Sequence, residues 1–198
     1  MTEPSPETPA FPADRSDSAG PARASVEDIL DRLCATVPDY PKPGITFKEL
    51  TPAFADAEGL RAIVDAIVAP FAGQFDLVAG IEARGFLLAA AAAYATGTGV
   101  LTVRKAGKLP RETFFEEYAL EYGTAALDVH TTDIRRGARV LVLDDVLATG
   151  GTVGAAVRLV NRCGGEVIGV GVVLELEGLG GRAALAGQRV HSLQRLRN

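Results

Sequence analysis

The stretch VLVLDDVLATGGT, Val140–Thr152, changes character within a few residues. Its apolar beginning predicts a buried strand over Arg139–Leu143. Two adjacent carboxylates, Asp144 and Asp145, follow at once, and Thr-Gly-Gly-Thr then leads into a helical pattern over Val153–Arg162. The stretch therefore predicts a strand, a polar turn and a helix in direct succession.

Strand and helix patterns alternate on both sides of this stretch. Helical periodicity covers Leu60–Phe71, and a further helix is expected over Phe86–Ala95. Strands are expected at Phe75–Ile81, at Val100–Arg104 and in the run EVIGVGVVLEL, and GGRAALAGQRVHSL supplies a short helix and a last strand. Several of these strands are apolar throughout. This alternation predicts an α/β fold, with a mainly parallel sheet flanked by helices on both faces.

Three local patterns lie outside this alternation. Ser25 and Asp28 have capping-box spacing at the start of a predicted N-terminal helix. The proline-rich segment Asp39–Pro52 is expected to be an ordered loop with little regular structure. The segments EYALEY and AALDVH alternate polar and apolar residues around Gly123-Thr124, which predicts a hairpin.

The composition favours one globular domain and disfavours two classes of partner. The chain has 198 residues, 47% of them hydrophobic, and its net charge of −5 disfavours general nucleic-acid binding. The longest apolar run, Phe86–Ala95, is shorter than the ~20 residues that a membrane span needs, so we expect no membrane segment. Residues 1–24 are rich in Pro, Ser and acidic residues and are predicted to form a disordered tail before a domain over 25–198.

The N-terminal segment and the cysteines lead us to expect a cytoplasmic location. The N-terminus lacks the basic and apolar regions of a secretion signal. Cys34 and Cys163 lack the spacing of a metal site or of a disulfide framework, and each lies among apolar residues of a predicted helix. They are expected to be reduced thiols in or near the core.

The turn after the acid pair is suited to binding a phosphate. Ligands of parallel sheets collect at the carboxyl ends of the strands, where the next helix directs its free N–H groups and the positive end of its dipole. Glycines let the backbone approach the anion, and hydroxyls add donors. The predicted phosphate-binding residues are Ala148, Thr149, Gly150, Gly151 and Thr152. Because the turn has no lysine, it does not match the ATPase loop GxxxxGK[ST], and a monophosphate fits better.

The acid pair next to this turn is suited to a sugar. Asp144 and Asp145 can accept hydrogen bonds from the neighbouring hydroxyls of a ribose, and a bound Mg²⁺ would reduce their mutual repulsion. A solvated turn followed by an ordinary helix start is the plainer interpretation, and the commoner one for a Thr-Gly-Gly-Thr turn alone. The complete order of strand, acid pair and glycine turn favours a ribose 5-phosphate unit.

This stretch resembles the phosphoribosyl-pyrophosphate signature of type I phosphoribosyltransferases. The chain as a whole is similar to the branch of that family that acts on adenine. The similar segments appear in the family's order and are DYPKPGITFKELTP, GIEARGFL, VRKAGKLPRETFFEEYALEYGTAALDVH, VLVLDDVLATGGT and LELEGLGGR. The resemblance implies the type I fold with a small hood and a flexible catalytic loop, dependence on Mg²⁺, and a homodimer.

The resemblance also implies a reaction and its participants. Adenine would replace pyrophosphate on phosphoribosyl pyrophosphate, giving AMP and pyrophosphate. The residues implied to contact pyrophosphate are Arg84, Arg104, Lys105 and Lys108, of which Arg84 and Lys108 are catalytic candidates. From the residues alone, the basic cluster could equally be a solvated loop. A cis peptide is expected at Glu82-Ala83. The Mg²⁺ would be carried by the substrate without dedicated protein ligands, and Asp144 or Asp145 could contact it.

A second set of residues is implied to contact the base. Phe47 and Leu176 match the residues on the two faces of adenine, and backbone groups around Thr46 and Lys48 match those that bind its edge. From composition alone, Phe47 and Leu176 would more often be core residues. Thr46 and Lys48 depart from the usual aliphatic residue and arginine, which leaves fine base preference open.

Two residues are implied to lie at the lip of the site. Glu121 is a candidate general base for the proton that the purine loses, and Tyr122 is its neighbour. A surface carboxylate is nearly as good an interpretation of Glu121 from the sequence.

Two other functions remain open from the sequence. A phosphoribosyltransferase for a 6-oxopurine would need a lysine and an acidic residue near the base, which the corresponding segment lacks. A regulator that senses phosphoribosyl pyrophosphate would need a DNA-binding domain or a basic face, which the acidic chain does not offer. A role of the tail in some interaction also stays open.

Overall fold

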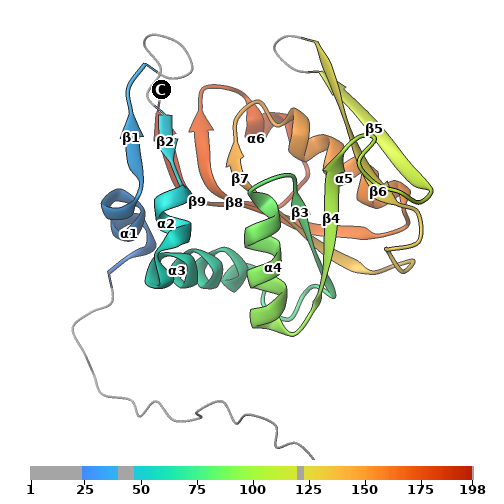
Figure 1. Ribbon diagram of the computed structural model, residues 1–198, viewed down its shortest axis with the longest axis horizontal. Helices are drawn as coiled ribbons and strands as arrows, with labels where there is room; N and C mark the ends of the chain where they lie inside the picture. Colours follow the sequence, from blue (N-terminus) through green and yellow to red (C-terminus); the bar gives the residue numbers. More distant parts are fainter. Residues whose placement is uncertain (1–23, 40–46, 120–122, 198) are drawn as a thin grey trace, which may run out of the picture.

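The strand that carries the acid pair is the middle strand of five parallel strands. We describe a computed structural model, which covers residues 24–39, 47–119 and 123–197 (Figure 1). The parallel strands lie in the order β4, β3, β7, β8 and β9. Their bounds are Leu77–Ile81 for β3, Gly99–Lys105 for β4, Arg139–Leu147 for β7, Glu166–Glu177 for β8 and Val190–Arg197 for β9.

An antiparallel hairpin extends one edge of this sheet. Strands β5 (Thr113–Ala119) and β6 (Thr124–His130) pair with each other in antiparallel register, which confirms the predicted hairpin. The first strand begins at Thr113, four residues before the predicted segment EYALEY. β6 also pairs antiparallel with β4, where Arg104 lies opposite Asp128. The sheet therefore has seven strands, in the order β5-β6-β4-β3-β7-β8-β9.

Helices cover both faces of the sheet and enclose two apolar cores. Helices α1 (Val26–Leu33), α2 (Thr51–Ala55), α3 (Ala57–Val68) and α4 (Gly85–Thr96) contribute to one core, and α5 (Gly151–Arg162) to the other. A short 3-10 helix, η1 (Ala69–Phe71), follows α3. Successive side chains of a strand point to opposite faces, so Leu141 and Leu143 of β7 enter the first core and Val140 and Val142 the second. The prediction of an α/β fold with helices on both faces is confirmed.

The capping box is also confirmed. The Asp28 N–H donates to Ser25 Oγ at 3.1 Å, and the Ser25 N–H donates to Asp28 Oδ2 at 3.2 Å. These reciprocal bonds satisfy donors that the first turn of α1 would otherwise leave free. None of the helices in the described part of the chain is long and apolar enough to cross a membrane.

Two further boundaries predicted from the sequence are wrong. β7 does not stop at Leu143 but continues to Leu147, because its last residues keep parallel pairing with β8. The segment Asp39–Pro52 is not all loop, since β2 (Phe47–Glu49) pairs antiparallel with β1 (Ala35–Val37). This small sheet lies at the blue and cyan end of the molecule in Figure 1. Residues 1–23 and 40–46, including most of the predicted tail, lie outside the described residues.

Candidate active site

The predicted phosphate turn lines a small cavity between β7 and α5. Gly150 has a φ of +83°, which glycine adopts without strain, and α5 starts one residue later. The free N–H groups of the first turn of α5 give this position a partial positive charge. The cavity has a volume of about 80 Å³ and is lined by Asp144, Val146, Leu147, Ala148, Thr149, Gly150, Gly151, Thr152 and Val153.

The acid pair lies beside this cavity and is almost buried. Asp144 and Asp145 are each 8% exposed, and the Asp145 N–H donates to Asp144 Oδ1 at 2.9 Å. Burial, followed by the negative charge of Asp145, raises the pKa of Asp144 well above its usual value. Two carboxylates at this spacing favour hydroxyl donors or a cation as the next partner, because either relieves their repulsion.

Arg84 connects the acid pair to the small β1-β2 sheet. Its Nε lies 2.7 Å from Asp145 Oδ2, and its Nη1 lies 3.5 Å from Glu49 Oε1. Asp145 Oδ2 accepts no aligned hydrogen bond within the described residues, so the contact with Arg84 is an ion pair. Hydrogen bonds from Thr51, helped by Arg84, lower the pKa of Glu49. The guanidinium therefore lies between two carboxylates at one edge of the site.

Glu82 gathers the remaining predicted pyrophosphate residues. Its carboxylate lies 2.9 Å from Lys108 Nζ and 3.5 Å from Arg104 Nε, and it accepts the Lys105 N–H at 2.9 Å. These contacts, the Lys108 bond above all, lower the pKa of Glu82. The peptide that joins Glu82 to Ala83 is cis, as predicted. The structure thus brings the side chains of Arg104 and Lys108 and the backbone of Lys105 together around a carboxylate that the sequence does not indicate as a site residue.

The predicted base-contacting residues lie on β2 and at the end of β8. Phe47 and Leu176 are both partly buried. The side chain of Lys48 is already bound, since its Nζ lies 2.5 Å from Asp31 Oδ1 and 2.7 Å from Gln194 Oε1. A role of Lys48 in base binding is therefore restricted to its backbone. Thr46, Glu121 and Tyr122 lie outside the described residues.

Only weak sequence signals point to Glu82 and Glu49, the two carboxylates that the sequence analysis does not predict. Glu82 stands two residues before Arg84 in EARG, and Glu49 stands two residues after Phe47, but both pair with residues far along the chain. An acid in a polar segment is usually solvated, and only the fold reveals a partner 26 or 35 residues away.

Comparison with known proteins identifies the class of this arrangement. Residues 48–184 match the model of the phosphoribosyl transferase domain, and the chain belongs to this family. The match runs from the small sheet through α6 (Gly181–Ala184), so it contains both glutamates and the phosphate turn.

Close relatives narrow the class to the adenine phosphoribosyltransferases, among which the chain belongs. It is 70% identical over 171 residues to the adenine phosphoribosyltransferase of Arthrobacter sp. (strain FB24), covering 86% of this chain and 92% of that protein. The identity to the enzyme of Renibacterium salmoninarum is 67%, over 88% of this chain and 96% of the relative. The crystal structure of adenine phosphoribosyltransferase from Thermoanaerobacter pseudethanolicus is 42% identical, with a TM-score of 0.82 over 87% of this chain and 100% of that one.

Proposed function

We propose that this protein transfers the phosphoribosyl group of phosphoribosyl pyrophosphate to adenine, giving AMP and pyrophosphate. The observation that carries this proposal is the acid pair at the end of β7, directly followed by the glycine turn and its cavity at the start of α5. Two relatives of this chain at 67% identity or more carry the name adenine phosphoribosyltransferase.

The sugar phosphate would bind across the end of β7. The N–H groups and hydroxyls of residues 148–152 would hold the 5-phosphate at the positive end of α5. Asp144 and Asp145 would accept hydrogen bonds from the ribose hydroxyls. In a transition state with positive charge on the sugar, an ionised carboxylate at this place is also stabilising.

Pyrophosphate would leave toward the positively charged side chains around Glu82 and Asp145. Arg84 lies at the acid pair, whereas Arg104 and Lys108 lie at Glu82, two residues earlier in the chain. Together with Lys105, these side chains can neutralise the charge that develops on the departing group. The segment with Lys105 and Lys108 would close over the site and exclude water from the reactive sugar.

Adenine would lie between Phe47 and Leu176. Its edge would meet backbone groups near Thr46 and Lys48, which agrees with the engagement of the Lys48 side chain elsewhere. Glu121 would accept the purine proton, with Tyr122 beside it at the lip of the site.

Mg²⁺ would enter with the sugar donor. Within the described residues, no group of three or more His, Cys, Asp or Glu side chains is arranged to hold a metal ion. The oxygen-rich acid pair fits one side of a hard cation, so substrate oxygens would supply most ligands and Asp144 or Asp145 the rest. The ion would neutralise phosphate charge when bound.

The active form would be a homodimer in the cytoplasm. Helix α4 has no charged residue, and its outer face exposes Leu87 and Tyr94, seven positions apart, by 55% and 86%. A surface helix usually has a polar outer face, so an apolar one is suited to packing against a second copy. Both cysteines, Cys34 and Cys163, are free thiols, which agrees with a reducing compartment.

The test is an assay of nucleotide formation with a panel of purines. Purified protein is mixed with Mg²⁺, phosphoribosyl pyrophosphate and adenine, hypoxanthine, guanine or xanthine. We expect AMP from adenine and little product from the other bases. Turnover of a 6-oxopurine instead would favour the related transferases, and tight nucleic-acid binding without turnover would favour a regulator.

A further inference from the structure

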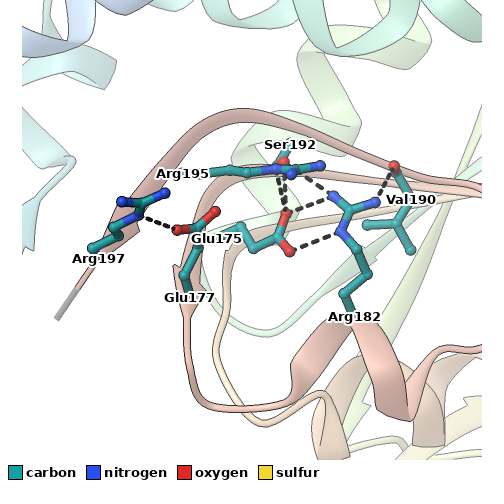
Figure 2. A network of polar contacts seen from close by, with 7 residues as sticks. All are labelled: Glu175, Glu177, Arg182, Val190, Ser192, Arg195 and Arg197. Atoms are coloured by element: carbon teal, nitrogen blue, oxygen red, sulfur yellow. Dashed lines mark hydrogen bonds and ion pairs between the residues drawn. The ribbon is translucent and has the colours of Figure 1, made fainter.

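Glu175 is a buried carboxylate near the end of β8, one residue before Leu176 (Figure 2). Arg182 of α6 donates to both of its oxygens, through Nε at 2.8 Å and Nη2 at 2.5 Å. From β9, the Ser192 hydroxyl donates to it at 2.8 Å and Arg195 Nε lies 3.4 Å away. We call Glu175, Arg182, Ser192 and Arg195 the Glu175 network. Chiefly through Arg182, these contacts lower the pKa of Glu175 to about 2, so the carboxylate is ionised at neutral pH.

Arg182 fixes the place of α6. Besides Glu175, it donates to the carbonyl of Val190 at 3.1 Å and to Ser192 Oγ at 3.3 Å. Helix α6 has only four residues, which is too short for a helix to be stable by itself. Its position therefore depends on tertiary contacts, and the fork of the Arg182 guanidinium supplies several of them at once.

Helix α6 in turn lies directly against the phosphate turn. A Cβ atom at Gly181 would lie 2.2 Å from the carbonyl oxygen of Ala148, and a Cβ atom at Gly150 would lie 2.8 Å from that of Gly181. Not even a methyl group fits between the two backbones. A shift of α6 therefore has to move the backbone of Ala148 to Gly150.

From this chain of contacts we propose that Glu175 and Arg182 are positioning residues for the phosphate turn. They act through α6 and touch neither the sugar nor the base. The proposal rests on the proposed function, because it assigns these residues to the binding of phosphoribosyl pyrophosphate. A purely structural ion pair would stabilise the fold without changing the affinity of the folded protein for this substrate.

The test compares Glu175→Gln with Glu177→Gln. Glu177 lies two residues further along β8 and pairs with Arg197 at 3.0 Å, outside the Glu175 network (Figure 2). The same substitution at Glu177 is therefore a matched control. Calorimetry with Mg²⁺ and phosphoribosyl pyrophosphate gives Kd, at a temperature well below the melting point of each variant. We expect Kd to rise at least about tenfold in Glu175→Gln and less than about twofold in Glu177→Gln.

A second variant tests the proposal independently in case Glu175→Gln does not fold. Arg182→Lys keeps the positive charge but loses the fork, and we expect Kd for phosphoribosyl pyrophosphate to rise about fivefold or more. Equal Kd values for the unsubstituted protein and for the folded variants would overturn the positioning role. If the unsubstituted protein itself fails to bind phosphoribosyl pyrophosphate, the proposed function and the positioning role fail together.

Discussion

Lys108 Nζ lies 2.9 Å from Glu82 Oε1, so a cation proposed for pyrophosphate is bound to a carboxylate of the protein itself. Pyrophosphate and Glu82 would compete for this ammonium, because both are anions. In the absence of substrate, the Glu82 carboxylate therefore offsets the positive charge of Lys108.

Replacing Glu82 should tighten pyrophosphate binding. In Glu82→Gln the competing charge is removed, and we expect Kd for pyrophosphate to fall about two- to fivefold, the range of a partly exposed ion pair. Isothermal calorimetry measures this Kd. Glu112→Gln, at an exposed position between β4 and β5, is the control. A weaker affinity in Glu82→Gln would show that Glu82 orients the cations instead of competing for them.

Replacing Asp145 should damage the use of the sugar donor. Asp145→Asn removes the charge that faces Arg84 and the proposed ribose, so kcat/KM for phosphoribosyl pyrophosphate should fall by about 10²-fold or more. The fold should be retained, which circular dichroism checks. Asp133→Asn, at a surface ion pair with Arg111, is the control. Unchanged steady-state kinetics in Asp145→Asn would count against the assignment.

A methyl group at Gly181 should weaken phosphate binding. The added carbon would lie 2.2 Å from the Ala148 carbonyl, so α6 and the phosphate turn must separate. We expect KM for phosphoribosyl pyrophosphate to rise in Gly181→Ala while KM for adenine changes little. Gly154→Ala is the control, since its Cβ would meet its nearest neighbour at 3.4 Å and alanine favours the α5 helix. Equal kinetics in the two variants would argue against the contact.

Acid should destabilise the protein through Glu175. Its pKa is about 2 in the folded chain and near 4.5 without these contacts, so the unfolded chain takes up the proton first as the pH falls. The contribution of the ionised Glu175 to the free energy of unfolding is fully present above pH 4.5 and is lost as the pH falls toward 2. Each unit of difference between the two pKa values corresponds to about 1.4 kcal/mol. Urea unfolding at a series of acidic pH values should show a flatter pH dependence for Glu175→Gln. Parallel curves for the variant and the unsubstituted protein would contradict this cause.

A charge on the outer face of α4 should separate the proposed dimer. Tyr94→Asp places a carboxylate where the exposed apolar face would pack against a second copy. Light scattering after gel filtration should then report a monomer mass. Ala95→Asp puts the same charge on the adjacent face of α4 and should leave the dimer intact. A dimer that survives Tyr94→Asp must use another surface.

The sequence predicted the elements whose stability depends on local pattern. The capping box at Ser25, the periodic helices α3 and α5 and the apolar strand β3 were identified because their periodicity is contained within each segment. The order of the acid pair and the glycine turn along the chain predicts a site, and the structure places Asp144 and the turn around one cavity.

The errors occurred where distant pairing outweighs local preference. Aspartate is rare in strands, so local preference predicts a strand end at Leu143, yet pairing with β8 extends β7 to Leu147. The three-residue strand β2 exists only because β1 pairs with it. Glu175 and Arg182 stood in LELEGLGGR, but the sequence pattern does not indicate that they meet.

The strand that carries the acid pair is held by both apolar cores of the sheet. β7 packs into both cores, and over Val140–Leu143 it has a parallel neighbour on each side, so freeing this part of the strand requires both cores to open. The acid pair directly follows this doubly flanked part of β7, whereas Lys105 and Lys108 lie at and beyond the end of β4 and are held to Glu82 by a backbone N–H and an ammonium group. Under the proposed function, substrate entry and product exit would proceed by movement of the segment from Lys105 to Lys108, with Asp144 and Asp145 serving as a stationary reference throughout the cycle.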